Sequence, residues 1–222
     1  SPFQFSIPFT SRIQNIYRDD HDRMWIATEQ GLFMFDPLQN QFNVTKLPVP
    51  EKINCIVYDR HISVGGTEYI ASACGLFYKN RKVHEYDFKE FRNRNEKLQL
   101  TSIFNDVHGN ILIGTNKTIF ILDTINITLS EIPANPKLLR TSFYSVYSSR
   151  ANSMDHIRSG GRNLTVVSYY GQYISLIDLN RKNIFWLSQS KNELIENLTR
   201  KIFVDSKNRM WVCGATFGIS EF

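Results

Sequence analysis

The sequence has few of the features that mark a metal-binding domain, a membrane protein or a helical protein. Its three cysteines are an odd number, and none stands at a metal-ligand spacing. No apolar run is long enough to cross a bilayer, and no stretch has the pattern of a secretory leader. No window keeps apolar residues at helical spacing for more than about two turns. We therefore expect a helix-poor domain that binds no metal and reaches a membrane only through segments outside these residues.

Catalytic motifs are missing as well. The chain has no Gly-x-Ser-x-Gly, no His-Glu-x-x-His and no phosphate-binding glycine loop. The five histidines are scattered, and the pairs Gly65-Gly66 and Gly160-Gly161 have the composition of turns. We predict that this chain is not an enzyme, has no catalytic residues and uses no cofactor.

Positive charge is in modest excess but is not concentrated anywhere. The formal net charge is +5, from 26 Lys and Arg against 21 Asp and Glu, and the densest run, "KEFRNRNEK", also contains two glutamates. Because no basic stripe would follow phosphates, we predict no nucleic-acid binding by this domain. A hydrophobic content of 42% in 222 residues is enough to bury the core of one domain.

One pattern occurs three times in the chain. It stands as "RDDHDRMWIATEQGLFMFD" from Arg18, "NDVHGNILIGTNKTIFILD" from Asn105 and "VDSKNRMWVCGATFGISEF" from Val204, with weaker copies near Tyr69 and Leu164. The copies recur at intervals of roughly 43–53 residues, which is the size of a propeller blade. The repeated structural positions are Asp19, Trp25, Gly31, Asp106, Gly109, Leu112, Asp205, Trp211 and Gly218.

Each repeat contains short runs rich in β-branched and aromatic residues, divided by turn residues. In the first repeat these runs are "IQNIY", "MWIAT", "LFMFD" and "QFNVTKL", which predict four antiparallel strands. Four such strands repeated around an axis form a blade, so we predict an all-β fold, a β-propeller. The predicted blades span 13–47, 53–88, 100–132, 141–187 and 199–222, and residues 1–10 are predicted to form an outer strand of a neighbouring or closing blade.

The repetition also assigns roles to single residues. An aspartate that recurs in every turn is better explained by hydrogen bonds to turn amides than by catalysis, which would need it once. Trp25 and Trp211 are expected to pack between blades. Cys55, Cys74 and Cys213 all fall in predicted strands, and Cys74 and Cys213 lie near equivalent positions of different repeats, so we expect buried free thiols. The extra length of the fourth repeat, residues 148–163, is expected to be an exposed, mobile insertion.

At the level of whole motifs, the repeat resembles the two-component regulator propeller. The pattern I-x-x-I-x-x-D-x-x-G-x-L-W-I-G-T-x-x-G-L-x-x-F-D stands here as "IQNIYRDDHDRMWIATEQGLFMFD", "LTSIFNDVHGNILIGTNKTIFILD" and "TRKIFVDSKNRMWVCGATFGISEF". The resemblance implies the periplasmic sensor region of a hybrid two-component regulator of the Bacteroidetes, anchored in the inner membrane. It implies carbohydrate sensing and an output, a histidine kinase or a transcription regulator, that these residues do not contain. Family propellers have seven blades, so the five repeats predict part of a larger propeller, with closure of a five-bladed ring as the alternative.

The loops between the second and third strands emerge on one side of a propeller and differ in chemistry from repeat to repeat. Amides, a lysine and aromatic rings suit an oligosaccharide or another small ligand. The candidate ligand-binding residues are Glu29, Gln30, Asn116, Lys117, Tyr169, Tyr170 and Phe217. Two alternatives remain open, a protein-interaction scaffold and a glycan-acting hydrolase. The other expected partners are further segments of the same protein, and a dimer is left open.

Overall fold

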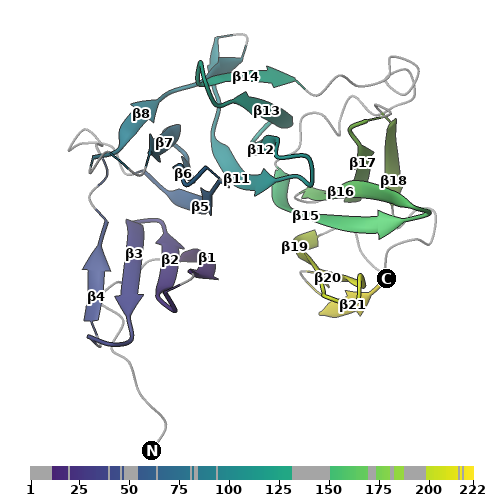
Figure 1. Cartoon of the computed structure of the whole chain (residues 1–222), viewed down its shortest axis with the longest axis horizontal. Helices are drawn as coiled ribbons and strands as arrows, with labels where there is room; N and C mark the ends of the chain where they lie inside the picture. Colours follow the sequence, from purple (N-terminus) through teal and green to yellow (C-terminus); the bar gives the residue numbers. More distant parts are fainter. Residues whose placement is uncertain are drawn as a thin grey trace, which may run out of the picture. The chain divides into compact units, whose positions relative to one another are not determined.

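The computed structural model describes residues 12–19, 21–39, 41–45, 47, 55–63, 65–80, 82, 85–93, 95–131, 151–169, 174–180, 183–187, 199–214, 216 and 218–222. Within these ranges all regular structure is strand (Figure 1). The prediction of an all-β fold is therefore confirmed. The predicted outer strand at residues 1–10 and the predicted start of the fourth blade lie outside the described residues.

The strands group into two compact units, Ser1–Glu90 and Phe91–Phe222. Unit 1 holds two four-stranded antiparallel sheets. The first consists of β1 (Ile13–Arg18), β2 (Met24–Thr28), β3 (Gly31–Asp36) and β4 (Gln41–Val44). The second consists of β5 (Val57–Ile62), β6 (Glu68–Ser72), β7 (Leu76–Lys79) and β8 (Asp87–Lys89).

Unit 2 begins with a short hairpin of β9 (Arg92–Asn93) and β10 (Glu96–Lys97), followed by three sheets. The first sheet consists of β11 (Leu100–Asn105), β12 (Ile111–Thr115), β13 (Ile119–Asp123) and β14 (Thr128–Glu131). The next consists of β15 (Ala151–Ser159), β16 (Arg162–Tyr169), β17 (Ile174–Asp178) and β18 (Asn183–Leu187). The last has β19 (Thr199–Val204), β20 (Met210–Gly214) and β21 (Ile219–Glu221). In all five of these larger sheets the strands pair in chain order, which is the topology of a propeller blade.

The second strands of the sheets carry much of the core. Every residue of β6 and of β12 is buried. In unit 1, Trp25 and Leu32 of the first sheet pack with Ile70 and Phe77 of the second. In unit 2, Leu112 packs against the sheet of β15–β18. Trp211 is only partly buried and belongs to no core cluster among the described residues, so the expected inter-blade role holds for Trp25 and not for Trp211.

In each of the five larger sheets, the pairing of the first two strands shifts register between the last residue of the second strand and the residue before it. The shifts fall at Ile13/Asn15, Val57/Asp59, Leu100/Ser102, Ala151/Ser153 and Thr199/Lys201. Such a bulge bends a strand and increases its twist. No residue type marks these positions, so the sequence pattern did not indicate the bulges.

The predicted mobile insertion in the fourth repeat is wrong. Its residues from 151 onward form a long β-hairpin in which β15 pairs with β16 up to Ser159 and Arg162. Gly160 and Gly161 make the turn with φ of 56° and 72°, conformations that favour glycine. The Asn208 side chain then secures the hairpin, accepting from the Arg158 amide at 2.7 Å and donating to the Arg158 carbonyl at 2.8 Å.

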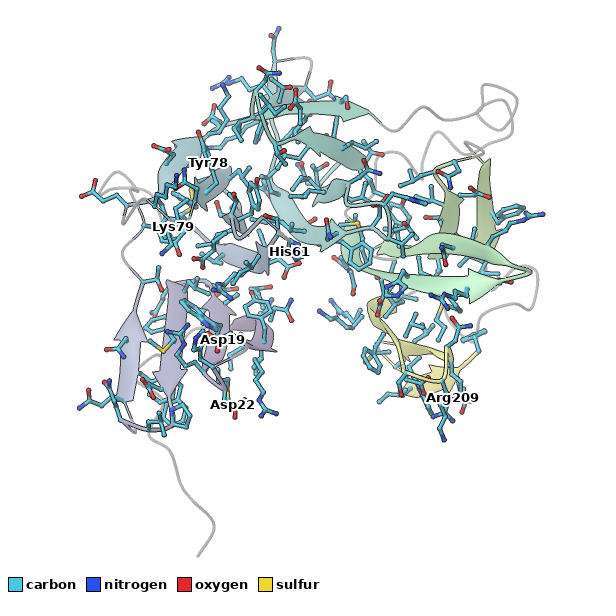
Figure 2. The ribbon with its side chains drawn as sticks, viewed as in Figure 1. Asp19, Asp22, His61, Tyr78, Lys79 and Arg209 are labelled. Carbon is cyan, nitrogen blue, oxygen red and sulfur yellow. A yellow bond between two sulfur atoms is a disulfide. The ribbon has the colours of Figure 1, made fainter. Side chains whose placement is uncertain are left out.

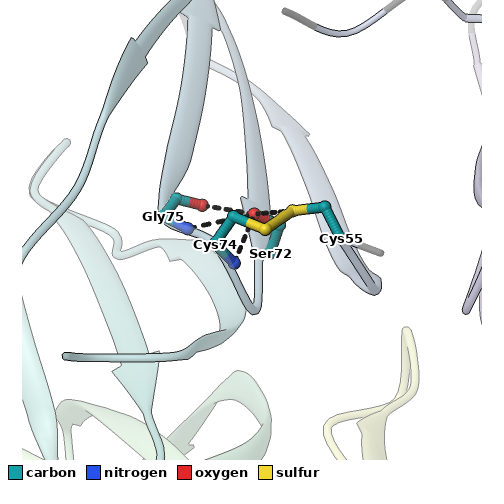
Figure 3. The surroundings of a disulfide bond; sticks show 4 residues. All are labelled: Cys55, Ser72, Cys74 and Gly75. Carbon is teal, nitrogen blue, oxygen red and sulfur yellow. Dashed lines mark hydrogen bonds between the residues drawn. A yellow bond between two sulfur atoms is a disulfide. The ribbon is translucent and has the colours of Figure 1, made fainter. Parts of the chain in front are cut away.

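The expectation of free thiols is wrong for two of the three cysteines. Cys55 precedes β5 and Cys74 lies in the loop between β6 and β7, and the two form a disulfide with a Cα–Cα distance of 5.6 Å (Figure 3). Cys213 is free. The repeat alignment compared Cys74 with Cys213 in another sheet, whereas the antiparallel pairing of β5 with β6 brings Cys74 to Cys55 within one sheet.

Candidate functional site

The aspartate of the first turn is the centre of a local hydrogen-bond network. Asp19 Oδ1 accepts from the amides of His21 and Arg23, both at 3.0 Å. Asp19 Oδ2 accepts from Arg23 Nε and Trp25 Nε1, both at 2.8 Å. Figure 2 labels Asp19 and Asp22 in this turn, and Asp22 has a φ of 60°. One carboxylate thus fixes the turn and orients the tryptophan of β2.

The same network recurs in the last sheet and, in altered form, in the sheet of β11–β14. Asp205 accepts from the Lys207 and Arg209 amides, from Arg209 Nε at 2.7 Å and from Trp211 Nε1 at 3.1 Å. Asp106 keeps the two amide contacts, but its Oδ2 accepts from Asn110 Nδ2 at 2.8 Å. In the sheet where Leu112 replaces the tryptophan of the second strand, the Asn110 side-chain amide replaces the cationic and indole donors.

These hydrogen bonds keep two of the carboxylates ionised. Partial burial raises the pKa of Asp19, but the hydrogen bonds from Trp25 and Arg23 outweigh it and hold the pKa well below 3.8. For Asp205, the Arg209 amide is the main cause that holds the pKa well below the same value. A carboxylate whose lone pairs are used in its own turn is not available as a general acid or base. The recurring acidic turn is therefore a structural element.

The opposite end of the second strand carries a second recurring motif, which the sequence analysis missed. Thr28 Oγ1 donates to the Gly31 carbonyl at 3.0 Å and accepts from the Gln30 amide at 3.0 Å. Thr115 Oγ1 makes the corresponding bonds with Thr118 and Lys117, and Ser72 Oγ makes them with Gly75 and Cys74. A Thr or Ser three or four residues before the start of the third strand is the sequence signal for this loop.

The candidate ligand residues of the first repeat lie in that loop. Glu29 is half-buried and Gln30 is exposed, both in the turn between β2 and β3. The Gln14 side chain approaches Glu29, with Nε2 at 3.5 Å from Oε1. Glu29 and Gln30 are thus adjacent in the chain, and both side chains are at least partly accessible to solvent.

Asn116 and Lys117 lie in the corresponding loop of unit 2, where the β9–β10 hairpin contacts them. Lys117 Nζ is 2.8 Å from Glu96 Oε2, and both side chains are substantially exposed. Asn116 Oδ1 accepts from the Gln99 amide at 3.1 Å, and the Asn116 amide donates to the Gln99 carbonyl at 3.0 Å. A ligand would have to compete with Glu96 for Lys117.

The prediction that Tyr169 binds a ligand from a loop is wrong, because the residue is buried. It ends β16 with its side chain 4% exposed, packs against Ala151 and Val167, and accepts a hydrogen bond at its hydroxyl from Ser175 Oγ at 3.3 Å. Because the strand continues through this position, its ring faces the core and cannot stack on a sugar. Tyr170 and Phe217 lie outside the described residues.

A charged cluster holds the two sheets of unit 1 together. Arg60 Nε lies 2.5 Å from Glu68 Oε1, with side-chain exposures of 8% and 10%, and the Arg60 guanidinium stacks 3.9 Å from the Trp25 ring. Lys79, labelled in Figure 2, adds a second cation at 3.4 Å from Glu68 and lies 4.2 Å from the Tyr86 ring. Burial, and then the charge of Glu68, raises the pKa of Tyr86, so the phenol is neutral. The Glu68 carboxylate is thus shared by two cations and is not available to a ligand.

A small pocket lies in unit 2 between the acidic turn of Asp106 and the sheet of β15–β18. Its lining includes His108, His156, Thr165 and Ile177. The His108 ring contacts the Asn180 amide, with Nε2 and Nδ2 3.1 Å apart. Within the described ranges, no three His, Cys, Asp or Glu residues are placed to hold a metal ion. A search of the same ranges finds no helix with the length and apolarity to span a membrane.

The comparisons with known proteins agree with the blade topology. Residues 7–30 match the family model described as two component regulator propeller. No curated protein sequence matches the chain. The first of the repeats that resemble the two-component regulator propeller therefore matches that family's model, at residues 7–30.

Solved structures similar to this chain are propellers of more than one function. The extracellular domain of a hybrid two-component system from B. thetaiotaomicron has a TM-score of 0.76 at 14% identity, covering 99% of this chain and 28% of that one. A second such domain from that organism has a TM-score of 0.69 at 20% identity, covering 94% and 26%. A virginiamycin B lyase from Staphylococcus aureus has a TM-score of 0.68 at 10% identity, covering 98% and 72%. These likenesses show the fold, and the chain spans under a third of the length of the two extracellular domains.

Proposed function

We propose that this chain is part of the extracytoplasmic sensor propeller of a two-component-type regulator. The match of residues 7–30 to the regulator propeller model carries the proposal, and the likeness to two extracellular domains of hybrid two-component systems supports it. On this proposal the rest of the protein supplies an inner-membrane anchor and a histidine kinase or transcription-regulating output. The larger propeller would be completed by further segments of the same protein, and signalling would involve a dimer.

The proposed ligand is a carbohydrate or a related polar molecule that binds at the loops between second and third strands. The acidic turns at the other end of the blades use their carboxylates internally, whereas Glu29, Gln30 and Lys117 present accessible polar groups. Binding residues concentrate on loops that a rigid scaffold holds, and the Thr and Ser caps described above hold these loops. The Lys117–Glu96 ion pair favours ligands that bind to both charges, such as sugar hydroxyls, over simple anions.

The hydrolase alternative has little support from the described residues. A glycosidase of the common type needs two carboxyl groups about 5 to 10 Å apart in a pocket. The pocket of unit 2 has Asp106 as its one carboxylate, and that side chain is hydrogen-bonded within its turn. A protein-interaction scaffold remains the second proposal, because exposed apolar side chains such as Ile16 (53%) and Phe203 (57%) occur on first strands.

Titration calorimetry with a panel of neutral and acidic oligosaccharides tests the ligand proposal. The wild type is compared with Lys117→Ala and Gln30→Ala, and with Lys207→Ala, an exposed lysine of the acidic-turn end, as the matched control. We expect binding that the first two substitutions weaken by about tenfold, the loss of one or two hydrogen bonds, and the control leaves unchanged. Equal binding by all four proteins places the site elsewhere. Absence of binding in every protein favours the scaffold.

A further inference from the structure

The second sheet of unit 1 lacks the acidic turn that fixes the first hairpin in the sheets of Asp19, Asp106 and Asp205. Its β5–β6 turn has Ser63 at the position of the aspartate, and this hydroxyl accepts one amide, that of Thr67, at 3.2 Å. No indole or guanidinium is tied to this turn among the described residues. The hairpin is therefore held by fewer side-chain contacts than the one that Asp19 organises.

The other end of the same sheet has a covalent link instead. The Cys55–Cys74 disulfide joins the segment that enters β5 to the loop that leaves β6, and the Cα–Cα distance of 5.6 Å is ordinary for a disulfide. Figure 3 shows Ser72 beside it, with its hydroxyl donating to the Gly75 carbonyl at 2.7 Å and accepting from the Gly75 amide at 3.1 Å. The Ser72 hydroxyl also lies 3.2 Å from Cys55 Sγ. The capped loop and the cross-link thus form one element.

The disulfide lies inside the core that joins the two sheets of unit 1. Cys55 and Cys74 are 8% and 5% exposed and pack in one cluster with Trp25, Leu32 and Phe77. A buried bond of this kind is protected from reductants in solution and restrains the unfolded chain over a separation of 19 residues. Its position suits a permanent structural link and does not suit an exchangeable one.

We propose that the Cys55–Cys74 disulfide stabilises unit 1 in place of the missing acidic turn, and that the protein acquires it in an oxidising compartment. The two thiols lose two protons and two electrons, and the electrons reduce a disulfide of the glutathione or thiol-oxidoreductase class to two thiols. Such bonds persist outside the cytosol and are rare within it. This inference is independent of any ligand, so failure to bind sugars would leave it standing.

The first test counts the free thiols of the full chain after the protein has been refolded with reduced and oxidised glutathione. The protein is denatured and alkylated with iodoacetamide without reduction, and peptides are identified by mass spectrometry. We expect one alkylated cysteine, Cys213, and a cross-linked peptide pair that contains Cys55 and Cys74. Three alkylated cysteines, or a cross-link that involves Cys213, would overturn the proposal.

The second test asks whether the bond stabilises unit 1 alone. Wild type refolded from denaturant with and without dithiothreitol, a Cys55→Ala/Cys74→Ala variant and a Cys213→Ala control are compared by thermal melting and by hydrogen exchange. Loss of the link should lower the midpoint for unit 1 by about 10 °C and speed exchange in β5–β7, with exchange in β11–β13 unchanged. The control should match the oxidised wild type. If the double variant does not fold, the reduced wild type supplies the same comparison, and unchanged exchange in β5–β7 would refute the inference.

Discussion

Replacing Asp19 with Asn tests the two carboxylate oxygens of the acidic turn separately, because it changes the hydrogen bonds of only one of them. The Asn side chain can still accept the His21 and Arg23 amides through its oxygen. Its NH₂ group, however, would face Arg23 Nε and Trp25 Nε1, which now bond to Asp19 Oδ2 at 2.8 Å. Guanidinium and indole groups only donate, so neither partner can adapt to the new donor. The substitution therefore removes two hydrogen bonds and places three donors against one another.

Asp106→Asn is the matched substitution with the opposite expectation. Asp106 Oδ2 accepts from Asn110 Nδ2, and the Asn110 amide can rotate to offer its oxygen to the new NH₂. A hydrogen bond to a charged group contributes roughly 1.5–3 kcal/mol, and an exchanged neutral one contributes close to nothing. We expect Asp19→Asn to lower the free energy of unfolding by about 2–3 kcal/mol and Asp106→Asn by about 1 kcal/mol or less.

Denaturant titration followed by circular dichroism and tryptophan fluorescence gives both values. The Trp25 indole donates to Asp19 in this turn. The fluorescence emission of Trp25 should therefore also shift in Asp19→Asn, because the indole loses its acceptor. The reasoning fails if the two variants are equally destabilised, or if Asp19→Asn unfolds at the denaturant concentration of the wild type. In either case the side-chain partners of Oδ2 would have no influence on the stability of the turn.

Three further predictions concern packing, backbone and pH. Trp25→Ala should cost about 3–5 kcal/mol, whereas Trp211→Ala should cost clearly less because that ring is only partly buried; paired denaturant melts measure the difference. Gly75→Ala should destabilise unit 1 by about 2 kcal/mol or more, since φ is 149° and a Cβ would meet the Lys89 carbonyl, and melting curves of purified variant and parent test it. Because the folded pKa values of Asp19 and Asp205 lie below 3.8, their stabilisation is present above that pH and declines as pH falls through it. The midpoint of urea unfolding should therefore be flat from about pH 7 to 5 and drop below about pH 4, and an unchanged midpoint at pH 3 would contradict this.

The blade pattern was predictable because it depends on local rules. Strand alternation, the turn aspartates and the glycines at positive φ are each encoded within a few residues, so three clear copies were enough to place the strands. The Thr28 cap depends on the same local rules and could have been found from a Thr or Ser three or four residues before a third strand.

What the sequence did not predict depends on pairing between segments. Polar composition suggested a loop at residues 148–163, but Ala151 and Ser153 alternate into the core of a strand whose partner lies beyond Gly161. The disulfide likewise depends on which strand ends meet, and a comparison of equivalent positions in different repeats could not show it. Tyr169 was expected in a loop, but β16 continues through this residue, and the ring therefore lies in the core.

The pairing of strands in chain order has a consequence for how the protein folds. Every larger sheet forms from hairpins between sequence neighbours, so most of its backbone contacts close short loops and the entropic cost of each is small. A sheet can assemble as soon as its own strands have been synthesised, without waiting for distant parts of the chain. Inter-sheet contacts such as Arg60 on Trp25 form afterwards, between partners that already have their strands. We expect folding to advance sheet by sheet along the chain, with the docking of neighbouring sheets as the slower event.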